Sequence, residues 1–401
     1  MKNHIKSLMI AALAVFSMMS TACSETDAEK DEGKVPSVQY VRMCAPGVSD
    51  SLLVRASLGQ RIAFIGENLG DVQQIYFNDQ KALLNPTLVT SNSIIVDVPS
   101  NIPVEVTDMV KFVTSKGITY EYPFAVTVPN PVLTSVSCQY AQPGDVLTIT
   151  GDYFLGTDEK PVKVKFPGVD AVVIDPADYT KTSLTVTVPA GATEEGAITV
   201  ESMYGSTRSS FLFLESSGMV TNFDDGYANP WGYPSAGELT DGGISGKYIK
   251  FYCEGNAAWN WTDKLMWGYW ASSDTPIATG DVSKLALRFE CNIITWSDCP
   301  LLIWFAKYVE GGGISPDDNY AQAHWKPWNN AGEKVNAATN GWTTVTIPLT
   351  DFKYNKDESV DNLSIGDISQ YSNLNFMMFG AVDNPADVNI LFDNIRIVTI
   401  E

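Results

Sequence analysis

Gln142-Pro-Gly-Asp-Val-Leu-Thr-Ile-Thr-Gly151 is the stretch that decides the fold of much of this 401-residue chain. A Pro-Gly-Asp turn starts a run in which apolar and polar residues alternate, and the run ends at a glycine. Alternation with a period of two is typical of a β-strand that buries one face. The stretch therefore predicts a strand that begins at a tight turn.

The same pattern occurs once earlier, in Ser57-Leu-Gly-Gln-Arg-Ile-Ala-Phe-Ile-Gly66. In both copies a later strand pattern stops at a proline, Pro99 or Pro189, which cannot continue a strand ladder. A hairpin glycine then precedes a closing strand with aromatic residues, Gly117 in the first copy and Gly205 in the second. The repeat predicts two small β-domains.

This pattern resembles the IPT/TIG family of immunoglobulin-like β-sandwiches, over roughly 180 residues in total. The match is closer in the second copy, because Gly59-Gln60 in the first copy stands where the second has Pro-Gly-Asp. The resemblance implies tandem spacer domains at 36–128 and 130–215, stiffly joined by Pro129-Asn-Pro131.

The composition changes after Ser216-Ser217-Gly218 and becomes rich in Gly, Asn, Asp and Trp. Strand patterns continue, and they predict one all-β domain over 218–401, a jelly-roll-like β-sandwich. The whole chain is therefore expected to be all-β. The strands expected in this last domain are 247–253, 284–291, 301–308, 342–349, 374–379 and 388–397.

All ten tryptophans of the chain lie between Trp231 and Trp342. That is more than one small core needs, because each indole is large and carries an N–H that requires a partner when buried. Trp304 and Trp342 lie in apolar strand patterns and are expected in the core. The rings with polar flanks are candidates for an exposed platform, with burial as the alternative for any single ring: Trp231, Trp259, Trp261, Tyr269, Trp270, Trp325 and Trp328.

Exposed aromatic faces stack on sugar rings, at roughly 1–2 kcal/mol per ring, so several rings suit a polysaccharide. The formal net charge of −21 argues against nucleic acid as a partner. No nucleophile, zinc or phosphate-loop motif is present, and no carboxylate pair of the kind used in glycoside hydrolysis stands out. We expect a non-catalytic binding protein. The alternatives are a glycoside hydrolase or lyase on a β-sandwich, and a protein-binding adhesin module.

The N-terminus carries Lys2 and Lys6, an apolar run over 8–16, and then Ser20-Thr-Ala-Cys23. The run is too short to span a bilayer, so 1–22 is expected to be a signal peptide. The last four residues resemble the bacterial lipobox, which implies lipidation of Cys23. The acidic run that follows is expected to be a solvated tether over 23–35. It resembles the surface-export signal of Bacteroidetes lipoproteins, which implies the outer face of the outer membrane.

Anchor, tandem spacers and an aromatic-rich last domain together resemble the surface glycan-binding proteins of Bacteroidetes polysaccharide utilisation loci, especially the B type of xyloglucan loci. The resemblance implies binding of xyloglucan or another neutral β-glucan, without a required cofactor. It also implies a neighbouring complex of a TonB-dependent transporter and a SusD-like protein. Members bind through an early tryptophan and a later Tyr-Trp pair, which Trp231 and Tyr269-Trp270 match.

Jelly-roll carbohydrate-binding domains often hold Ca²⁺ between their first and last strands. That resemblance implies a structural calcium at Asp224 and Asp393, and ordinary turn aspartates are the alternative. Cys291 and Cys299 could form one disulfide in an oxidising compartment, with buried free thiols as the other interpretation.

Overall fold

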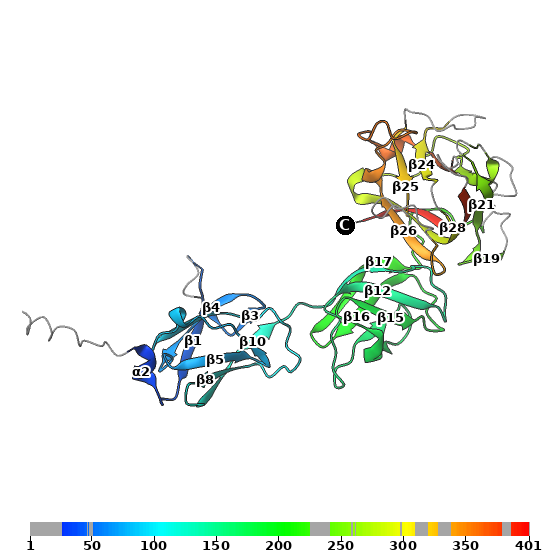
Figure 1. The fold of residues 1–401 in the computed structure, drawn as a ribbon. Coiled ribbons are helices and arrows are strands. Elements are labelled where there is room, and N and C mark those ends of the chain that lie inside the picture. The colour runs from blue at the N-terminus through cyan, green and yellow to red at the C-terminus, as the bar shows by residue number, and fades with distance from the viewer. Residues whose placement is uncertain are drawn as a thin grey trace, which may run out of the picture. The chain divides into compact units, whose positions relative to one another are not determined.

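The computed structural model describes residues 26–45, 47, 51–224, 241–257, 260, 262–296, 299–308, 320–327, 338–378 and 386–400. Over these residues the structure is nearly all β, which confirms the predicted fold class. The chain divides into two compact units, Met1–Pro129 and Asn130–Glu401, which are described separately (Figure 1).

The first unit is a sandwich of two antiparallel sheets, with strand orders β2-β1-β4-β7 and β6-β5-β8-β9. A short parallel pair, β10-β3, lies beside them. The elements are β1 (Ser37–Met43), β2 (Leu52–Leu53), β3 (Arg55–Ser57), β4 (Arg61–Glu67), β5 (Val72–Phe77), β6 (Gln80–Lys81), η1 (Pro86–Leu88), β7 (Ser93–Asp97), β8 (Met109–Thr114), β9 (Thr119–Pro123) and β10 (Ala125–Thr127).

The second unit begins with a second sandwich of nearly the same topology, with strand orders β11-β12-β15 and β14-β13-β16-β17. Its elements are β11 (Val132–Val136), β12 (Val146–Asp152), β13 (Lys163–Lys165), β14 (Val172–Val173), η2 (Pro176–Asp178), β15 (Ser183–Thr187), β16 (Gly196–Ser202) and β17 (Gly205–Phe213). The equivalent strand orders confirm the internal repeat.

The glycines that end the two repeated strands are required by a close backbone approach. A Cβ on Gly66 would lie 1.9 Å from the carbonyl oxygen of Ser37, and one on Gly151 would lie 1.8 Å from that of Val132. Both contacts are far inside van der Waals distance, so only glycine fits. The glycine at the end of each repeated strand therefore lies where the backbone of a neighbouring strand comes close.

We expected the acidic run after the predicted lipidation site to be a solvated tether. Part of it is instead folded and packed on the first sandwich. Helix α2 (Asp27–Asp31) lies within it and begins with a capping box between Thr26 and Glu29. The Asp31 carboxylate is buried and accepts the Gly70 N–H at 3.1 Å, while Asp27 accepts the Ser91 N–H at 3.2 Å. This part of the run is docked on the first sandwich because backbone donors there need acceptors.

The C-terminal domain is a sandwich of a five-stranded and a four-stranded sheet. The larger sheet has the order β18-β28-β23-β26, with β21 also paired to β28, and the smaller has the order β22-β27-β24-β25. Its strands are β18 (Met219–Thr221), β19 (Asp241–Gly243), β20 (Gly246–Lys247), β21 (Ile249–Asn256), β22 (Met266–Tyr269), β23 (Leu285–Thr295), β24 (Leu301–Ala306), β25 (Gln322–Trp325), β26 (Thr343–Pro348), β27 (Asn373–Met378) and β28 (Ala386–Thr399). Short 3₁₀ turns are η3 (Asp263–Leu265), η4 (Val282–Lys284), η5 (Leu349–Asp351) and η6 (Ile368–Gln370).

The predicted strands of this domain are confirmed, with ends that differ by a few residues. Trp304 is fully buried, as expected. Trp342 packs instead against the hydrophobic cluster of the second sandwich, with its ring 6.2 Å from that of Tyr248. Cys291 and Cys299 are both buried, and they are not joined by a disulfide.

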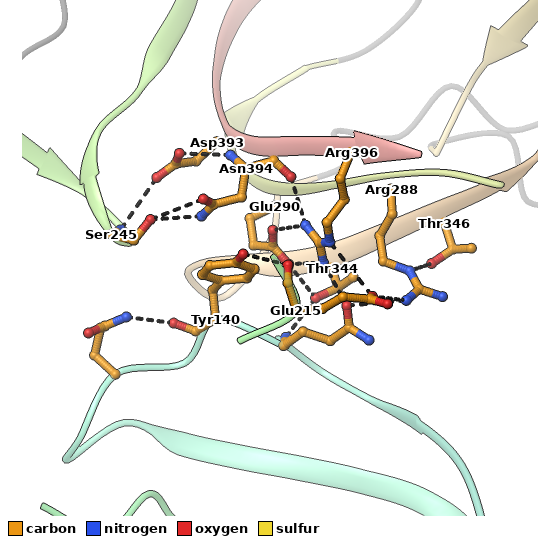
Figure 2. Close-up of polar contacts among 12 residues, drawn as sticks. Tyr140, Glu215, Ser245, Arg288, Glu290, Thr344, Thr346, Asp393, Asn394 and Arg396 are labelled. Carbon is orange, nitrogen blue, oxygen red and sulfur yellow. Dashed lines mark hydrogen bonds and ion pairs between the residues drawn. The ribbon is translucent and has the colours of Figure 1, made fainter. Parts of the chain in front are cut away.

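A buried charge cluster joins the second sandwich to the C-terminal domain (Figure 2). Arg396 of β28 is completely buried and binds both oxygens of Glu290, at 2.7 and 3.1 Å. The same guanidinium donates to Gln139 of the second sandwich at 2.6 Å and lies 5.0 Å above the ring of Tyr140. One buried cation therefore has partners in both domains.

A second arginine repeats this arrangement. Arg288 of β23 donates to Glu215 at 2.7 Å and to Thr346 at 3.0 Å. Thr344 adds a strand-like contact, because its N–H donates to the carbonyl of Ser137 at 2.9 Å. We call this set the junction: Gln139, Tyr140, Glu215, Arg288, Glu290, Thr344 and Arg396. Its ion pairs lie out of water, where an unpaired charge is costly.

Glu290→Gln removes the charge partner of buried Arg396. We expect the free energy of unfolding of the second unit to fall by about 3–5 kcal/mol, because the buried guanidinium loses its nearest counter-charge and keeps only the more distant Glu215, at 3.8 Å. Urea unfolding followed by circular dichroism and tryptophan fluorescence measures this.

The matched control is Glu201→Gln, which breaks a 3.4 Å pair with Lys163 in which both side chains are at least 40% exposed. That change should cost less than about 1 kcal/mol. Equal losses in the two variants would contradict a structural role for the junction.

Candidate functional site

The smaller sheet of the C-terminal sandwich uses its two faces differently. Cross-strand rows alternate between them, because successive residues of a strand point to opposite sides. The row of Trp267, Phe376 and Ile303 faces the main core. The alternate rows project to the other side, where they contribute a separate layer, the outward cluster, made of Met266, Leu302, Trp304, Ala306 and Met377.

Trp270 lies at this outward face, directly after β22. It is partly buried against the outward cluster, and its Nε1 donates to Asn375 Oδ1 at 2.9 Å. A Cβ on Gly268 would lie 2.5 Å from that same Nε1, so the glycine makes room for the indole. The ring is thus held in one position while part of it stays accessible.

Two asparagines of β27 fix this segment. Asn375 accepts the indole N–H of Trp270, and Asn373 Oδ1 accepts the Ala271 N–H at 2.8 Å. Sequence reasoning missed both residues. The signal was the polar alternation of Asn373-Leu-Asn375 in an otherwise apolar strand, which places both amides on one face.

The outward face also contains buried donors. Asn375 Nδ2 and Trp304 Nε1 have no hydrogen-bond partner among the described residues, although both side chains are fully buried. The two residues are direct cross-strand partners, so their side chains project from the same row. The face is therefore polar as well as aromatic.

Tyr269 is adjacent to Trp270 in sequence but packs against the main core cluster, not the outward one. The two rings pack on opposite faces of the sheet because the side chains of successive residues in an extended segment point to opposite sides. Both are half-buried. Of the predicted Tyr-Trp pair, Trp270 is the ring placed at the outward face.

Trp325 ends β25, an edge strand of the same sheet. Its ring packs edge-on against Phe289 at 5.4 Å and Trp296 at 5.0 Å, and it remains partly exposed. It lines a cavity of about 410 Å³ at the edge of the sandwich. Trp325 and Trp270 therefore belong to different surfaces.

Four of the predicted ring positions lie outside the described residues: Trp231, Trp259, Trp261 and Trp328. The predicted lipidation site, Cys23, also lies outside them. Within the part of the chain that the structure describes, no helix is long and apolar enough to cross a bilayer.

Asp224 and Asp393 are brought to the same turn, between β19 and β20. Asp224 accepts the Lys247 N–H at 2.8 Å, and Asp393 accepts those of Asn394 at 2.7 Å and Ser245 at 3.4 Å. Burial raises the pKa of Asp393 to about 7, against the effect of these donors and with the help of the Glu290 and Asp224 charges.

The carboxylate pair meets the needs of calcium only in part. Calcium takes six to eight oxygen ligands. Among the described residues, no group of three or more acidic, histidine or cysteine side chains is placed to hold a metal ion. The contacts present are those of aspartates that stabilise a turn, and calcium here stays a prediction.

Comparisons with known proteins agree with this organisation. Residues 131–211 match the IPT/TIG domain family, and residues 213–399 match the family described as surface glycan-binding protein B xyloglucan binding domain. A Bacteroides ovatus IPT/TIG domain-containing protein is 29% identical over 208 residues, which cover 48% of this chain and 42% of that protein.

The structure is also similar to solved ones. The crystal structure of surface glycan-binding protein PbSGBP-B from Prevotella bryantii has a TM-score of 0.76 and 28% identity, and the match covers 91% of this chain and 99% of that one. An SGBP-B from a complex xyloglucan utilization locus in Bacteroides uniformis is 18% identical with a TM-score of 0.46, over 91% and 100% of the two chains. With a segment that matches the IPT/TIG family directly followed by one that matches the xyloglucan binding domain family, the chain is similar to surface glycan-binding proteins of the B type.

Proposed function

We propose that this chain binds a neutral polysaccharide, xyloglucan or another β-glucan, at the outward face of the smaller C-terminal sheet, and that it does so without catalysis. The observation that carries the proposal is the Trp270 indole, which is held over Gly268 by Asn375 and stays partly exposed. The match of residues 213–399 to a xyloglucan-binding domain family supports it.

The fixed position of Trp270 suits sugar binding. An aromatic ring against the apolar face of a pyranose contributes roughly 1–2 kcal/mol, and less of this is lost when the ring is already ordered. Its own N–H is satisfied by Asn375, so a ligand need not supply an acceptor there. Trp231 and the tryptophans at 259, 261 and 328 are proposed to extend the platform.

The remaining parts of the proposal concern location. Lipidation of Cys23 would anchor the chain in the outer membrane, facing outward, beside a complex of a TonB-dependent transporter and a SusD-like protein. The signal-like N-terminus, with its apolar run and Ser20-Thr-Ala-Cys23, supports the anchor. The two sandwiches would then act as spacers between the membrane and the glycan-binding domain.

Trp270→Ala should abolish or strongly weaken retardation of the protein in native gels cast with xyloglucan, because the fixed stacking surface is removed. The matched control is Tyr252→Ala, which removes an aromatic ring that is 39% exposed on β21 of the other sheet. The control should migrate as the wild type does.

Release of reducing sugar from xyloglucan by the wild type would replace the binding proposal with that of a glycoside hydrolase or lyase. Retardation retained by Trp270→Ala would move the site away from the outward face. No retardation of the wild type by any neutral glycan would overturn the function itself.

Asp393 predicts a pH dependence of stability. Its pKa in the folded protein is raised to about 7 from an ordinary 3.8, so the folded state binds this proton more tightly. The resulting stabilisation is full below about pH 4 and is lost as the pH rises through about 7, by roughly 2–4 kcal/mol.

The measurement is urea unfolding of the wild type and of Asp393→Asn between about pH 5 and pH 8. The stability of the wild type relative to the variant should fall as the pH rises. Saturating calcium should cancel this fall in the wild type alone if calcium binds at Asp393. The same slope with calcium and with chelator would contradict the calcium prediction and leave the turn role.

A further inference from the structure

A second concave surface lies at the edge of the C-terminal sandwich. We call it the edge cleft and define it by Thr346 of β26, His324 and Trp325 of β25, and Asp351, Lys353 and Tyr354 of the segment after β26. Its volume is about 410 Å³, within the range of small-molecule sites. All of its lining residues are described by the structure.

The aromatic part of the cleft is rigid. The Trp325 ring is held edge-on by Phe289 and by Trp296, whose own Nε1 donates to the Cys299 carbonyl at 2.6 Å. Tyr354 provides a second ring, 5.5 Å from that of His324, with Lys353 Nζ 5.3 Å above it. Two ordered rings therefore border one space.

The polar part of the cleft is balanced in charge. Asp351 and Lys353 are exposed at its rim and carry opposite charges. His324 is deeply buried, and burial lowers its pKa below the ordinary value although its Nδ1 lies 2.7 Å from the Glu358 carboxylate. The Thr346 hydroxyl accepts Arg288 Nε and so faces the junction, and Thr346 lines the cleft with the rest of the residue. This combination suits a neutral ligand with many hydroxyls.

The backbone of β25 adds a donor and an acceptor. Gln322 pairs outward with the segment after β26: its N–H donates to the Tyr354 carbonyl at 2.8 Å, and its carbonyl accepts the Tyr354 N–H at 3.1 Å. Because backbone groups alternate in direction along a strand, the N–H and carbonyl of His324 point the same way, away from β24. Among the described residues, the bridge between β25 and the segment after β26 joins Gln322 and Tyr354, and the His324 groups lie beyond it.

We propose that the edge cleft is a second saccharide site, which takes one sugar residue of the same neutral glycan chain. The inference rests on the proposed function, since it assumes a glycan ligand, but it uses different residues. Trp325 packs against the main core, whereas Trp270 packs against the outward cluster. The two sites can therefore be removed one at a time.

The test compares a short and a long ligand. The variant Asp351→Ala/Lys353→Ala changes only exposed rim residues, so its fold should be intact. Isothermal calorimetry with a xyloglucan heptasaccharide should give two sites in the wild type and one in the variant. Affinity for polymeric xyloglucan should fall about tenfold in the variant, because linked sites act together.

A second variant, Tyr354→Ala, removes the aromatic wall and should have the same effect. One oligosaccharide site in the wild type, with unchanged polymer affinity in both variants, would overturn the second site while leaving glycan binding intact. If the proposed glycan binding itself were wrong, the wild type would bind neither the oligosaccharide nor the polymer. Trp270→Ala should remove the other oligosaccharide site and leave that of the edge cleft.

Discussion

The buried guanidinium of Arg396 is the constraint on which the arrangement of the second unit depends. A cation out of water must be paired and hydrogen-bonded, and Arg396 obtains its partners from two domains: Glu290 from its own sheet and Gln139 from the preceding sandwich. Moving either domain would leave charges or amides without partners. The second sandwich and the C-terminal domain therefore behave as one body, and the proposed binding surfaces keep a fixed direction relative to β11–β17.

Tryptophan has three distinct roles in the C-terminal domain. Trp267 and Trp296 fill the space between the two sheets, and Trp304 closes the outward cluster. Trp342 seals the boundary with the second sandwich. Trp270 and Trp325 are held by neighbours while still partly exposed, and these are the positions from which binding is proposed. The excess of aromatic residues indicated a binding surface. Which rings are exposed on it and which are buried beneath it depends on the face of the strand from which each ring projects.

The fold was largely predictable because its signals are local. Alternating strands and the strand-ending prolines Pro99 and Pro189 can be recognised from a few consecutive residues. The site was less predictable because its contacts join distant strands: Trp270 depends on Asn375, more than a hundred residues later. The docking of α2 and the second-sandwich contact of Trp342 have the same cause, since partners on other elements decide them.

Strand β28 pairs with β18 and β21 on one side and with β23 on the other, and it carries Arg396. This segment follows every other strand of the domain in the sequence. The larger sheet and the junction are both incomplete without it. Pairings of such long sequence separation form slowly. Without β28, the strands β18, β21 and β23 would each present an unpaired edge, which is a template for pairing with another chain.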